Sequence, residues 1–215
     1  MTALPAVTAV VLAGGRSTRF GRDKLAEPLE GRPLLHRAIE AVATIATEVI
    51  VVTAPGTRPT LPDLARGVAG VAAEVRLVHD DAPFEGPLAG CLAGLVSARE
   101  PFVLVVGGDM PSLRPAVLEV LVRTLEASSA DACALEHLGR RQPLPMALRT
   151  GTGTATVERL LHESERRLGA VLDRMIVRSL SEGEWRPLDP DALSLRDVDE
   201  PDDLPPAPDE RPARS

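Results

Sequence analysis

The sequence predicts an α/β protein, a three-layer sandwich in which helices cover both faces of a mostly parallel, mixed sheet. Short valine-rich runs alternate along the chain with segments of helical periodicity, and strands that are linked through helices pair in parallel. With 215 residues, 44% of them hydrophobic, the chain can bury one large core. We therefore expect a single domain over residues 1–204. The remainder, 205–215, is rich in proline and charge and is expected to be a flexible tail.

Short apolar runs predict the strands of the first half of the chain, at residues 8–13, 48–53, 75–78 and 101–111. Runs of this length and composition, without polar alternation, are typical of strands that are buried on both faces. The last of these runs ends in a glycine-containing loop.

Helices are expected between these strands, at residues 32–45 and 86–100. In the first, Pro33 suits the opening turn. The apolar residues behind it fall on one helical face: Leu34, Leu35, Ala38, Ile39 and Val42. The second helix is rich in glycine and alanine, so we expect it to pack closely on the sheet.

The second half of the chain continues the alternation. A periodic helix is expected at residues 114–128, two strands around a glycine-bearing turn at 131–136 and 145–149, a helix at about 153–172 and a last strand at 175–180. Ligands of such sheets bind beyond the carboxyl ends of the strands. Function is therefore expected in four loops, those that follow Leu12, Val52, Val78 and Val106.

Charge and cysteine content exclude several classes of protein. The net charge of −7 comes from the C-terminal part: residues 1–181 contain 20 acidic and 20 basic side chains, and residues 182–215 contain 11 and 4. The sequence has no basic patch of the kind that predicts nucleic-acid binding. No apolar run approaches the roughly 20 residues of a membrane span, and the N-terminus lacks the basic start of a secretory signal. Two cysteines form neither a disulfide framework nor a cysteine-rich zinc site. We expect a cytoplasmic protein without membrane contact, in which Cys91 packs as a small hydrophobe.

The stretch VVLAGGRSTRFGRDK, residues 10–24, has the chemistry of a phosphate-binding loop. Gly14 and Gly15 let the backbone turn sharply and approach a ligand, and successive N–H groups in such a turn can bind an anion. Two hydroxyl side chains and four cations follow, the cations being Arg16, Arg19, Arg22 and Lys24. The stretch matches neither GxxxxGK[ST] nor GxGxxG. The alternative is a solvated basic loop.

Lys24 is the chain's single lysine, beside 23 arginines. In a chain that otherwise uses arginine, this one lysine indicates a place where a compact ammonium is needed and the guanidinium fork does not fit. The alternative is chance, because one lysine has to lie somewhere.

Asp109 follows the fourth predicted strand, in VVGGDMPSL. At the end of a buried apolar strand, a carboxylate can cap a turn or the helix that begins near Arg114. It can instead hold Mg²⁺ beside the phosphates of a nucleotide, since Mg²⁺ is often bound through one carboxylate, phosphate and water. We favour magnesium because the cationic loop is predicted at the same edge of the sheet.

The loop after the third strand, HDDAPFEGPLAG, is a candidate for base recognition. A glycine at the start of a helix, here Gly86, lets a flat base lie against the backbone. A carboxylate, here Asp80, can accept from the two adjacent donors of guanine. The alternative is a helix cap with a solvated turn, which we favour for Asp81.

These motifs together resemble the nucleotidyltransferases with a glycosyltransferase-A-like, Rossmann-like fold. LAGGRSTRFGRDK is most similar to the molybdenum cofactor guanylyltransferase family, and EGPLAG, GGDMP, QPLPMALR and RDVDEPDDL stand at family-like places. The resemblance covers about residues 7–204. Cytidylyltransferases of the same cofactor usually show LAAG, and Gly14 speaks against them.

The resemblance implies a reaction and a set of site residues. The reaction is transfer of GMP from GTP to the terminal phosphate of molybdopterin, with Mg²⁺ and release of pyrophosphate. Lys24, Arg19 and Asp109 would be catalytic, with Asp109 as the metal ligand. The implied nucleotide-binding residues are Leu12, Ala13, Gly14, Gly15, Arg19, Lys24, Thr53, Asp80, Gly86 and Asp109.

The chain departs from the family pattern at three positions. Thr53 stands where the family often has asparagine, and Asp197 and Asp199 stand where it has two asparagines. An aspartate accepts hydrogen bonds but does not donate them unless it is protonated. If these positions touch the pterin, substrate contacts differ there.

Two alternatives to this function stay open on the sequence. One is a related cytidylyl or sugar-phosphate nucleotidyltransferase, and the other is a nucleotide-binding protein without turnover. The expected partners are GTP and molybdopterin, with transient contacts to other enzymes that make or use the cofactor.

Overall fold

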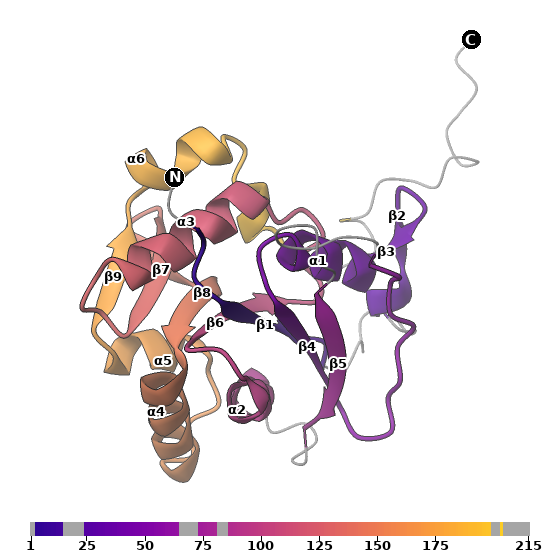
Figure 1. The fold of residues 1–215 in the computed structure, drawn as a ribbon, viewed down its shortest axis with the longest axis horizontal. Coiled ribbons are helices and arrows are strands. Elements are labelled where there is room, and N and C mark those ends of the chain that lie inside the picture. Colours follow the sequence, from indigo (N-terminus) through magenta and orange to yellow (C-terminus); the bar gives the residue numbers. More distant parts are fainter. Residues whose placement is uncertain (1–2, 15–23, 65–72, 81–85, 199–202, 204–215) are drawn as a thin grey trace.

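A seven-stranded sheet forms the centre of the computed structural model, which describes residues 3–14, 24–64, 73–80, 86–198 and 203 (Figure 1). The strands lie in the order β5-β4-β1-β6-β8-β7-β9. Their bounds are Val7–Leu12 for β1, Glu48–Thr53 for β4, Glu74–His79 for β5, Phe102–Gly107 for β6, Ala132–His137 for β7, Arg140–Arg149 for β8 and Val177–Leu180 for β9.

The sheet is mixed, and its parallel part comes from the first half of the chain. Strands β5, β4, β1 and β6 run parallel to one another, so their carboxyl ends share one edge. Strand β8 is antiparallel to both β6 and β7, and β9 pairs in parallel with β7. The predicted mostly parallel, mixed sheet is confirmed.

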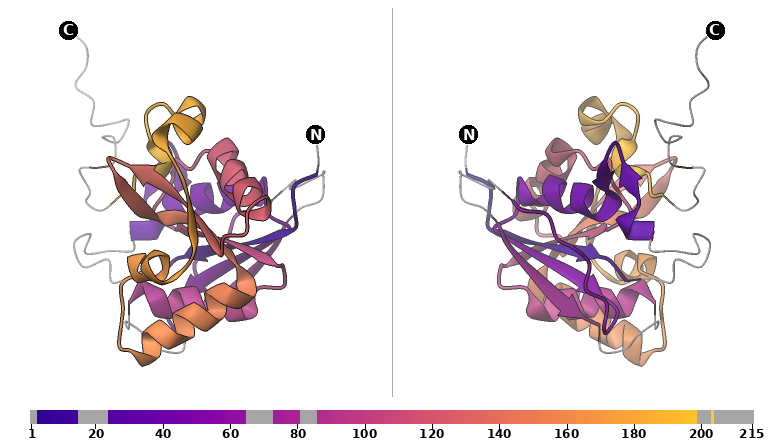
Figure 2. Two further views of the ribbon diagram at one scale, coloured as in Figure 1. Left: turned by 90° about the vertical axis from the view of Figure 1, so that its left-hand side faces the viewer. Right: turned by 90° about the vertical axis from the view of Figure 1, so that its right-hand side faces the viewer.

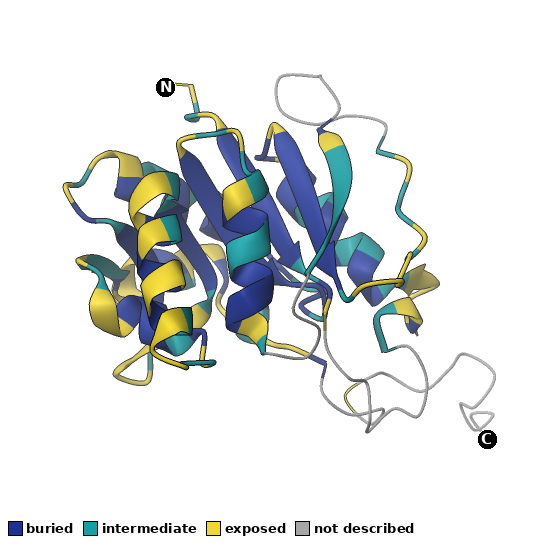
Figure 3. Ribbon diagram, turned by 90° about the horizontal axis from the view of Figure 1, so that it is seen from below, coloured by how far each residue is buried: buried dark blue, intermediate teal, exposed yellow. Residues whose placement is uncertain are grey.

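Helices cover both faces of this sheet, which confirms the three-layer arrangement (Figures 1 and 2). Helices α1 (Leu34–Ala43) and α3 (Pro115–Glu126) lie on one face. Helices α2 (Pro87–Ser97), α4 (Thr150–His162) and α5 (Gly169–Arg174) lie on the other. Figure 3 views this second face and shows α2 beside α4, with the exposed residues of α4 turned away from the sheet.

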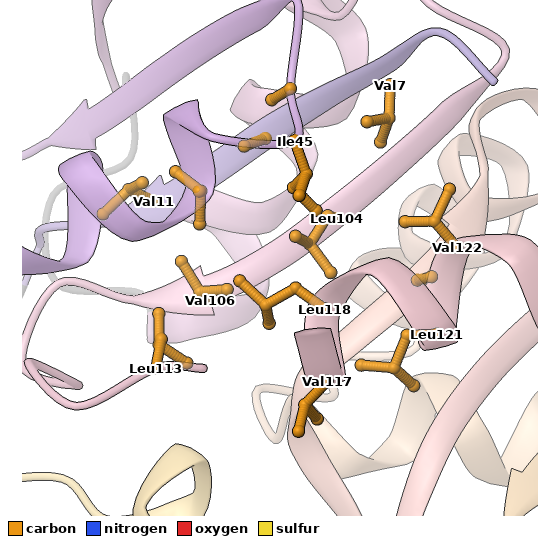
Figure 4. Packing of buried hydrophobic residues seen from close by; sticks show 14 of the residues in the cluster. Val7, Val11, Ile45, Leu104, Val106, Leu113, Val117, Leu118, Leu121 and Val122 are labelled. Carbon is orange, nitrogen blue, oxygen red and sulfur yellow. The ribbon is translucent and has the colours of Figure 1, made fainter. Parts of the chain in front are cut away.

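Alternate residues of the buried strands supply the two hydrophobic cores. Val11 and Leu104 point to the first face and pack with Leu118 of α3 (Figure 4). Val10 and Val105 point to the second face and pack with the helices there. This alternation is the period of two that a strand imposes on its side chains.

Helix α2 lies very close to the sheet, as its small residues predict. A Cβ placed on Gly94 would be 2.4 Å from Cγ1 of Val10, so only glycine fits this crossing. Cys91 of the same helix is fully buried, and burial raises the pKa of its thiol to about 12. Its expected role as a small packed hydrophobe is confirmed.

A charged cluster ties the strands together at the amino edge of the parallel strands. The Glu48 carboxylate is buried and accepts a hydrogen bond from the Thr8 hydroxyl at 2.8 Å. It also accepts from Nε and Nη2 of Arg76, at 2.9 and 2.6 Å. Burial alone raises the pKa of Glu48, but these hydrogen bonds, with one from the Arg99 backbone N–H, outweigh it and leave the pKa below its ordinary value.

Several predicted boundaries differ from the structure. The helix expected at 153–172 is two helices, α4 and α5, because the chain turns after α4 through Ser164, whose φ is 62°. The glycine-bearing turn is shorter than predicted: Leu138 and Gly139, both with positive φ, connect β7 directly to β8. Pro33 is the N-cap of α1 and not part of its first turn.

The segments that were not predicted are short. Strands β2 (Pro28–Leu29) and β3 (Arg32–Pro33) form a small hairpin before α1. Helix α6 (Glu182–Trp185) begins with a capping box at Ser181, and its Trp185 is buried and donates from Nε1 to the Glu136 carbonyl at 3.0 Å. The turns that follow are η3 (Arg186–Leu188) and η4 (Leu193–Leu195).

The last described residues return to the central sheet. The Val198 N–H donates to the Asp109 carbonyl at 3.0 Å, and the Arg114 N–H donates to Oγ of Ser194 at 2.9 Å. Buried Asp189 accepts from the Ser194 N–H at 2.7 Å. The closing segment is thereby fixed to the loop between β6 and α3. The predicted tail, 205–215, lies outside the described residues.

The described part of the chain contains no helix that is both long and apolar enough to cross a membrane.

Candidate active site

The carboxyl edge of the parallel strands brings most of the predicted site residues together. Hydrogen bonds extend the pairing past the strand ends: the Ala13 N–H donates to Val52 O at 2.8 Å, and the Gly108 N–H donates to Leu12 O at 2.9 Å. The Asp80 N–H donates to Thr53 O at 2.9 Å in the same way. The four loops that were expected to carry function therefore begin side by side.

A close backbone approach joins the loops after β1 and β6. A Cβ on Gly108 would lie 3.2 Å from the Leu12 carbonyl oxygen and 3.2 Å from Cδ1 of Leu35. A side chain at position 108 would push the Asp109 loop away from β1. The glycine thus sets the distance between the predicted nucleotide-binding strand end and the predicted metal ligand.

An ion pair between Lys24 and Asp109 lies at this edge. Nζ of Lys24 is 2.9 Å from Oδ2 of Asp109, and the two side chains are 14% and 28% exposed. Asp109 is not the cap of α3, because the N-cap of that helix is Arg114 and no side chain caps it. The chain's one lysine and the carboxylate after β6, which the sequence singled out separately, are in contact.

Backbone hydrogen bonds position both partners of the pair. Lys24 begins the short helix η1 (Lys24–Ala26), and its carbonyl accepts from the Glu27 N–H at 3.1 Å. The Glu27 carbonyl in turn accepts from the Leu34 N–H at 3.0 Å, which joins η1 to the start of α1. Asp109 is held from the other side by Val198.

Asp80, Leu12 and helix α2 form a second part of the edge. A Cβ on Gly90 of α2 would lie 3.6 Å from Cδ2 of Leu12 and 3.9 Å from Oδ2 of Asp80. Helix α2 begins after Gly86, whose φ of 97° favours glycine. The predicted base-recognition residues are therefore neighbours on one surface.

Thr53 is placed differently from the other predicted residues. It is fully buried; its hydroxyl donates to Thr57 O at 3.2 Å and lies 3.1 Å from Nδ1 of His79. The hydroxyl thus faces the protein, and the Thr53 carbonyl accepts from the Asp80 N–H between the two strands. A nucleotide contact of Thr53 stays a prediction.

Some predicted residues lie outside the described part of the chain, namely Gly15, Arg16, Arg19, Arg22, Asp81 and Asp199. Asp197 is described and exposed. The structure adds two neighbours of the site that the sequence analysis did not single out. Val198 contacts Asp109, and the Arg166 carbonyl would be 3.2 Å from a Cβ on Gly86. Both contacts join segments far apart in the sequence, so no local pattern predicts them.

The residues described at this edge fit a magnesium ion that arrives with a nucleotide. Asp109 supplies carboxylate oxygen, the hard ligand that Mg²⁺ prefers, and is partly exposed. Among the described residues there is no group of three or more His, Cys, Asp or Glu that could hold a metal by itself. A single carboxylate suits Mg²⁺ that keeps water and phosphate as its other ligands.

A family model described as the MobA-like NTP transferase domain matches residues 9–180, from β1 to the end of β9. The chain belongs to the MobA-like NTP transferase family. A probable molybdenum cofactor guanylyltransferase of Chloroflexus aggregans is 32% identical over 202 residues, which cover 92% of this chain and 91% of the relative. A molybdenum cofactor guanylyltransferase of Desulfosudis oleivorans is 29% identical, with 94% of each chain covered. The chain is a nucleotidyltransferase, as the sequence predicts.

Solved structures share the fold of this MobA-like chain. The molybdopterin-guanine dinucleotide biosynthesis protein A of Archaeoglobus fulgidus matches with a TM-score of 0.72 and 24% identity, covering 92% of this chain and 94% of that protein. A 2-C-methyl-D-erythritol 4-phosphate cytidylyltransferase of Thermus thermophilus matches with a TM-score of 0.63 and 17% identity, covering 91% and 94%. Identities this low carry the fold only, so the choice of base rests on the site.

Proposed function

We propose that the protein transfers GMP from GTP to the terminal phosphate of molybdopterin, with Mg²⁺, and releases pyrophosphate. The observation that carries the proposal is the contact between Lys24 and Asp109 at the carboxyl edge of the sheet. In this proposal Lys24 would be the cation for the phosphates and Asp109 the ligand for magnesium, and their contact supports a shared site. The proposal is supported by the names of the relatives, which are guanylyltransferases.

The reaction needs no nucleophile from the protein. An oxygen of the acceptor's terminal phosphate, already ionised near neutral pH, attacks the α-phosphorus of GTP in line. The new O–P bond forms as the bond from the α-phosphorus to the bridging oxygen breaks, and the electron pair leaves with pyrophosphate. The protein contributes positioning and charge stabilisation.

Each site residue has a role in that work. Bound Mg²⁺ would neutralise charge on the phosphate oxygens, and Asp109 would hold it. Lys24 and Arg19 would bind the triphosphate and stabilise the charge that grows on the leaving pyrophosphate. The nucleotide would lie along the strand end at Leu12 and Ala13, with Gly14 and Gly15 giving the backbone room to approach.

Base choice is assigned to the surface formed by Asp80, Leu12 and α2. The Asp80 carboxylate would accept from the two adjacent N–H donors of guanine, with Gly86 opening α2 beside it. Cytosine offers an exocyclic amine but no imino hydrogen, so one acceptor would be left unpaired. A site built on such partners discriminates strongly against a ligand that leaves them unsatisfied.

The test is a nucleotide panel. The protein is incubated with Mg²⁺, molybdopterin and either GTP, CTP or ATP, and pyrophosphate release and the dinucleotide product are measured. We expect release with GTP that depends on the acceptor, and much less with CTP or ATP. Asp109→Asn is the inactive control. Preference for CTP would support a cytidylyltransferase, and turnover only with a sugar phosphate as acceptor would support a sugar-phosphate nucleotidyltransferase. Nucleotide binding without turnover would support the second alternative. Transient contacts with further enzymes of the cofactor and a cytoplasmic location stay predictions.

A further inference from the structure

Lys24 and Asp109, which the proposed function assigns to the phosphates and to the metal, are bound to each other in this structure, with 2.9 Å between Nζ and Oδ2. We propose that this ion pair is a closed resting state of the site, which makes the divalent cation and the nucleotide bind cooperatively. The inference rests on the proposed function and adds a coupling between its two ligands.

Either ligand alone would meet the pair unfavourably. A cation that takes the Asp109 carboxylate leaves the Lys24 ammonium beside it, so two positive groups face each other. A nucleotide that takes Lys24 without a metal leaves the carboxylate facing phosphate oxygens. When both bind, Lys24 faces phosphate and Asp109 faces the metal, and opposite charges alternate across the site. Like charges at such distances are costly and opposite charges are favourable, so the pair is best opened by both ligands together.

The backbone of both partners is held by hydrogen bonds that are separate from the ion pair. Lys24 is anchored through its carbonyl, which accepts from the Glu27 N–H, and Asp109 through its carbonyl, which accepts from the Val198 N–H. Both bonds use main-chain atoms and do not involve the two charged groups, so they can persist when the ion pair opens. The absence of a side chain at Gly107 makes room for this carboxylate, because a Cβ there would be 2.5 Å from Oδ1 of Asp109.

The arrangement of potential metal ligands among the described residues also favours cooperative binding of the cation and the nucleotide. No group of three or more potential metal ligands occurs among them, so these residues offer a free divalent cation no complete ligand set at Asp109, and Lys24 already contacts one of the Asp109 oxygens. Free metal should therefore bind weakly until phosphates supply the remaining ligands.

The single lysine makes this coupling directly observable. Protein labelled with ¹³C at the lysine Cε carries one labelled side chain, because Lys24 is the only lysine of the chain. Its resonance is followed in wild type with Mg²⁺ alone, with GTP and a chelator, and with both ligands. Asp109→Asn supplies the reference for a Lys24 that has lost its carboxylate. We expect small changes with either ligand alone and a large shift with both at the same concentrations.

Affinities of the separate ligands give an independent measurement. Lys24→Met should bind free Mn²⁺, measured by electron paramagnetic resonance, about 5- to 10-fold more tightly than wild type. Asp109→Asn should bind GTP in the presence of chelator more tightly by a similar factor. These factors follow from the order of 1 kcal/mol expected for a partly exposed ion pair. Arg114→Met is the matched control: it removes a cation from the β6–α3 connection that carries Asp109, but the Arg114 side chain is 52% exposed and its Nε is 3.9 Å from Asp189, so Mn²⁺ affinity should stay at the wild-type value.

Equal Mn²⁺ affinity of Lys24→Met and wild type would overturn the proposal, as would a full shift of the Lys24 resonance with Mg²⁺ alone. If Lys24→Met does not fold, the wild-type titration and Asp109→Asn decide. Failure of the proposed function gives a different result. In that case wild type binds no GTP even with Mg²⁺, while the Mn²⁺ comparison still decides whether the pair restrains the metal site.

Discussion

Replacing Gly94 with alanine tests how closely helix α2 packs on the sheet. The added Cβ would lie 2.4 and 2.8 Å from the two γ-carbons of Val10, whereas carbon atoms in contact are about 3.5–4.0 Å apart. Val10 is fully buried and β-branched, so its side chain has no free rotamer to adopt. Helix α2 must therefore move outward by about 1 Å to relieve the overlap.

The expected cost is the difference between two effects. Overpacking a tight core position costs about 1–3 kcal/mol, and this overlap with two carbons belongs at the upper end. Alanine in place of glycine within a helix recovers about 1 kcal/mol. We expect Gly94→Ala to lower the free energy of unfolding by about 2 kcal/mol, or the melting temperature by roughly 4–8 °C. Because Gly90 of the same helix adjoins Asp80, nucleotide affinity should fall as well.

Urea unfolding of four variants checks this reasoning: Gly94→Ala, Gly151→Ala, Val10→Ala and the double variant. Gly151→Ala is the control, because Gly151 lies in α4 with no atom within 4 Å of the added Cβ; stability should rise by up to about 1 kcal/mol. Val10→Ala removes both clashing carbons, so the double variant with Gly94→Ala should be more stable than the sum of the single effects predicts, by about 1–2 kcal/mol. If Gly94→Ala behaves like Gly151→Ala, or the double variant is strictly additive, the close packing of α2 is not what restricts this position.

Four further predictions concern the site and the sheet. Lys24→Arg should lower turnover on the order of 10²–10³-fold, because the planar guanidinium of arginine does not replace the compact ammonium of lysine between phosphates. Near-normal rates in a steady-state assay would contradict this. Asp109→Ala should abolish Mg²⁺-dependent turnover while circular dichroism shows the native fold, and a variant that unfolds would indicate a structural role. Asp80→Ala should weaken the preference for GTP over CTP and ATP in competitive binding more than it weakens phosphate binding; an unchanged preference would move base recognition to the backbone near Gly86. Glu48→Gln should lower stability by about 1–3 kcal/mol at pH 7. The pKa of Glu48 is held below its ordinary 4.5, so its ionised form stabilises the fold above pH 4.5 and this contribution is lost as the pH falls through the lowered pKa. The difference in stability between the two proteins should therefore shrink on acidification, and a pH-independent difference would refute the assignment.

The strands of the parallel sheet were predictable because a strand that is buried on both faces is a continuous apolar run in the sequence. The run at Glu48–Thr53 was expected at the observed residues, and those ending at Leu12 and His79 within one residue. Once the strands are parallel, topology alone brings their carboxyl ends together, which is why the loops of Asp80 and Asp109 could be selected from the sequence. Lys24 was selected because it is the chain's single lysine and lies in the cationic loop after β1.

The features that escaped prediction depend on contacts between distant residues or on single backbone angles. The break between α4 and α5 follows from a positive φ at Ser164. Serine rarely adopts this conformation, and no sequence pattern predicts it here. The early start of β8 follows from a two-residue turn that includes Leu138, also with positive φ. The orientation of the Thr53 hydroxyl depends on His79, which comes from another strand.

The hydrogen bond from Val198 to Asp109 has a consequence for how the protein is made. Synthesis proceeds from the N-terminus, and folding of a domain can begin before the chain is complete. All four parallel strands precede residue 108, so the sheet edge that carries Asp80 and Asp109 exists early in the nascent chain. The Asp109 carbonyl, however, receives the Val198 N–H only after residue 198 has been translated. A shorter ribosome-bound intermediate would thus carry the strands of the site without the contact that fixes its carboxylate loop, and full ligand affinity would appear only once residue 198 has left the ribosome.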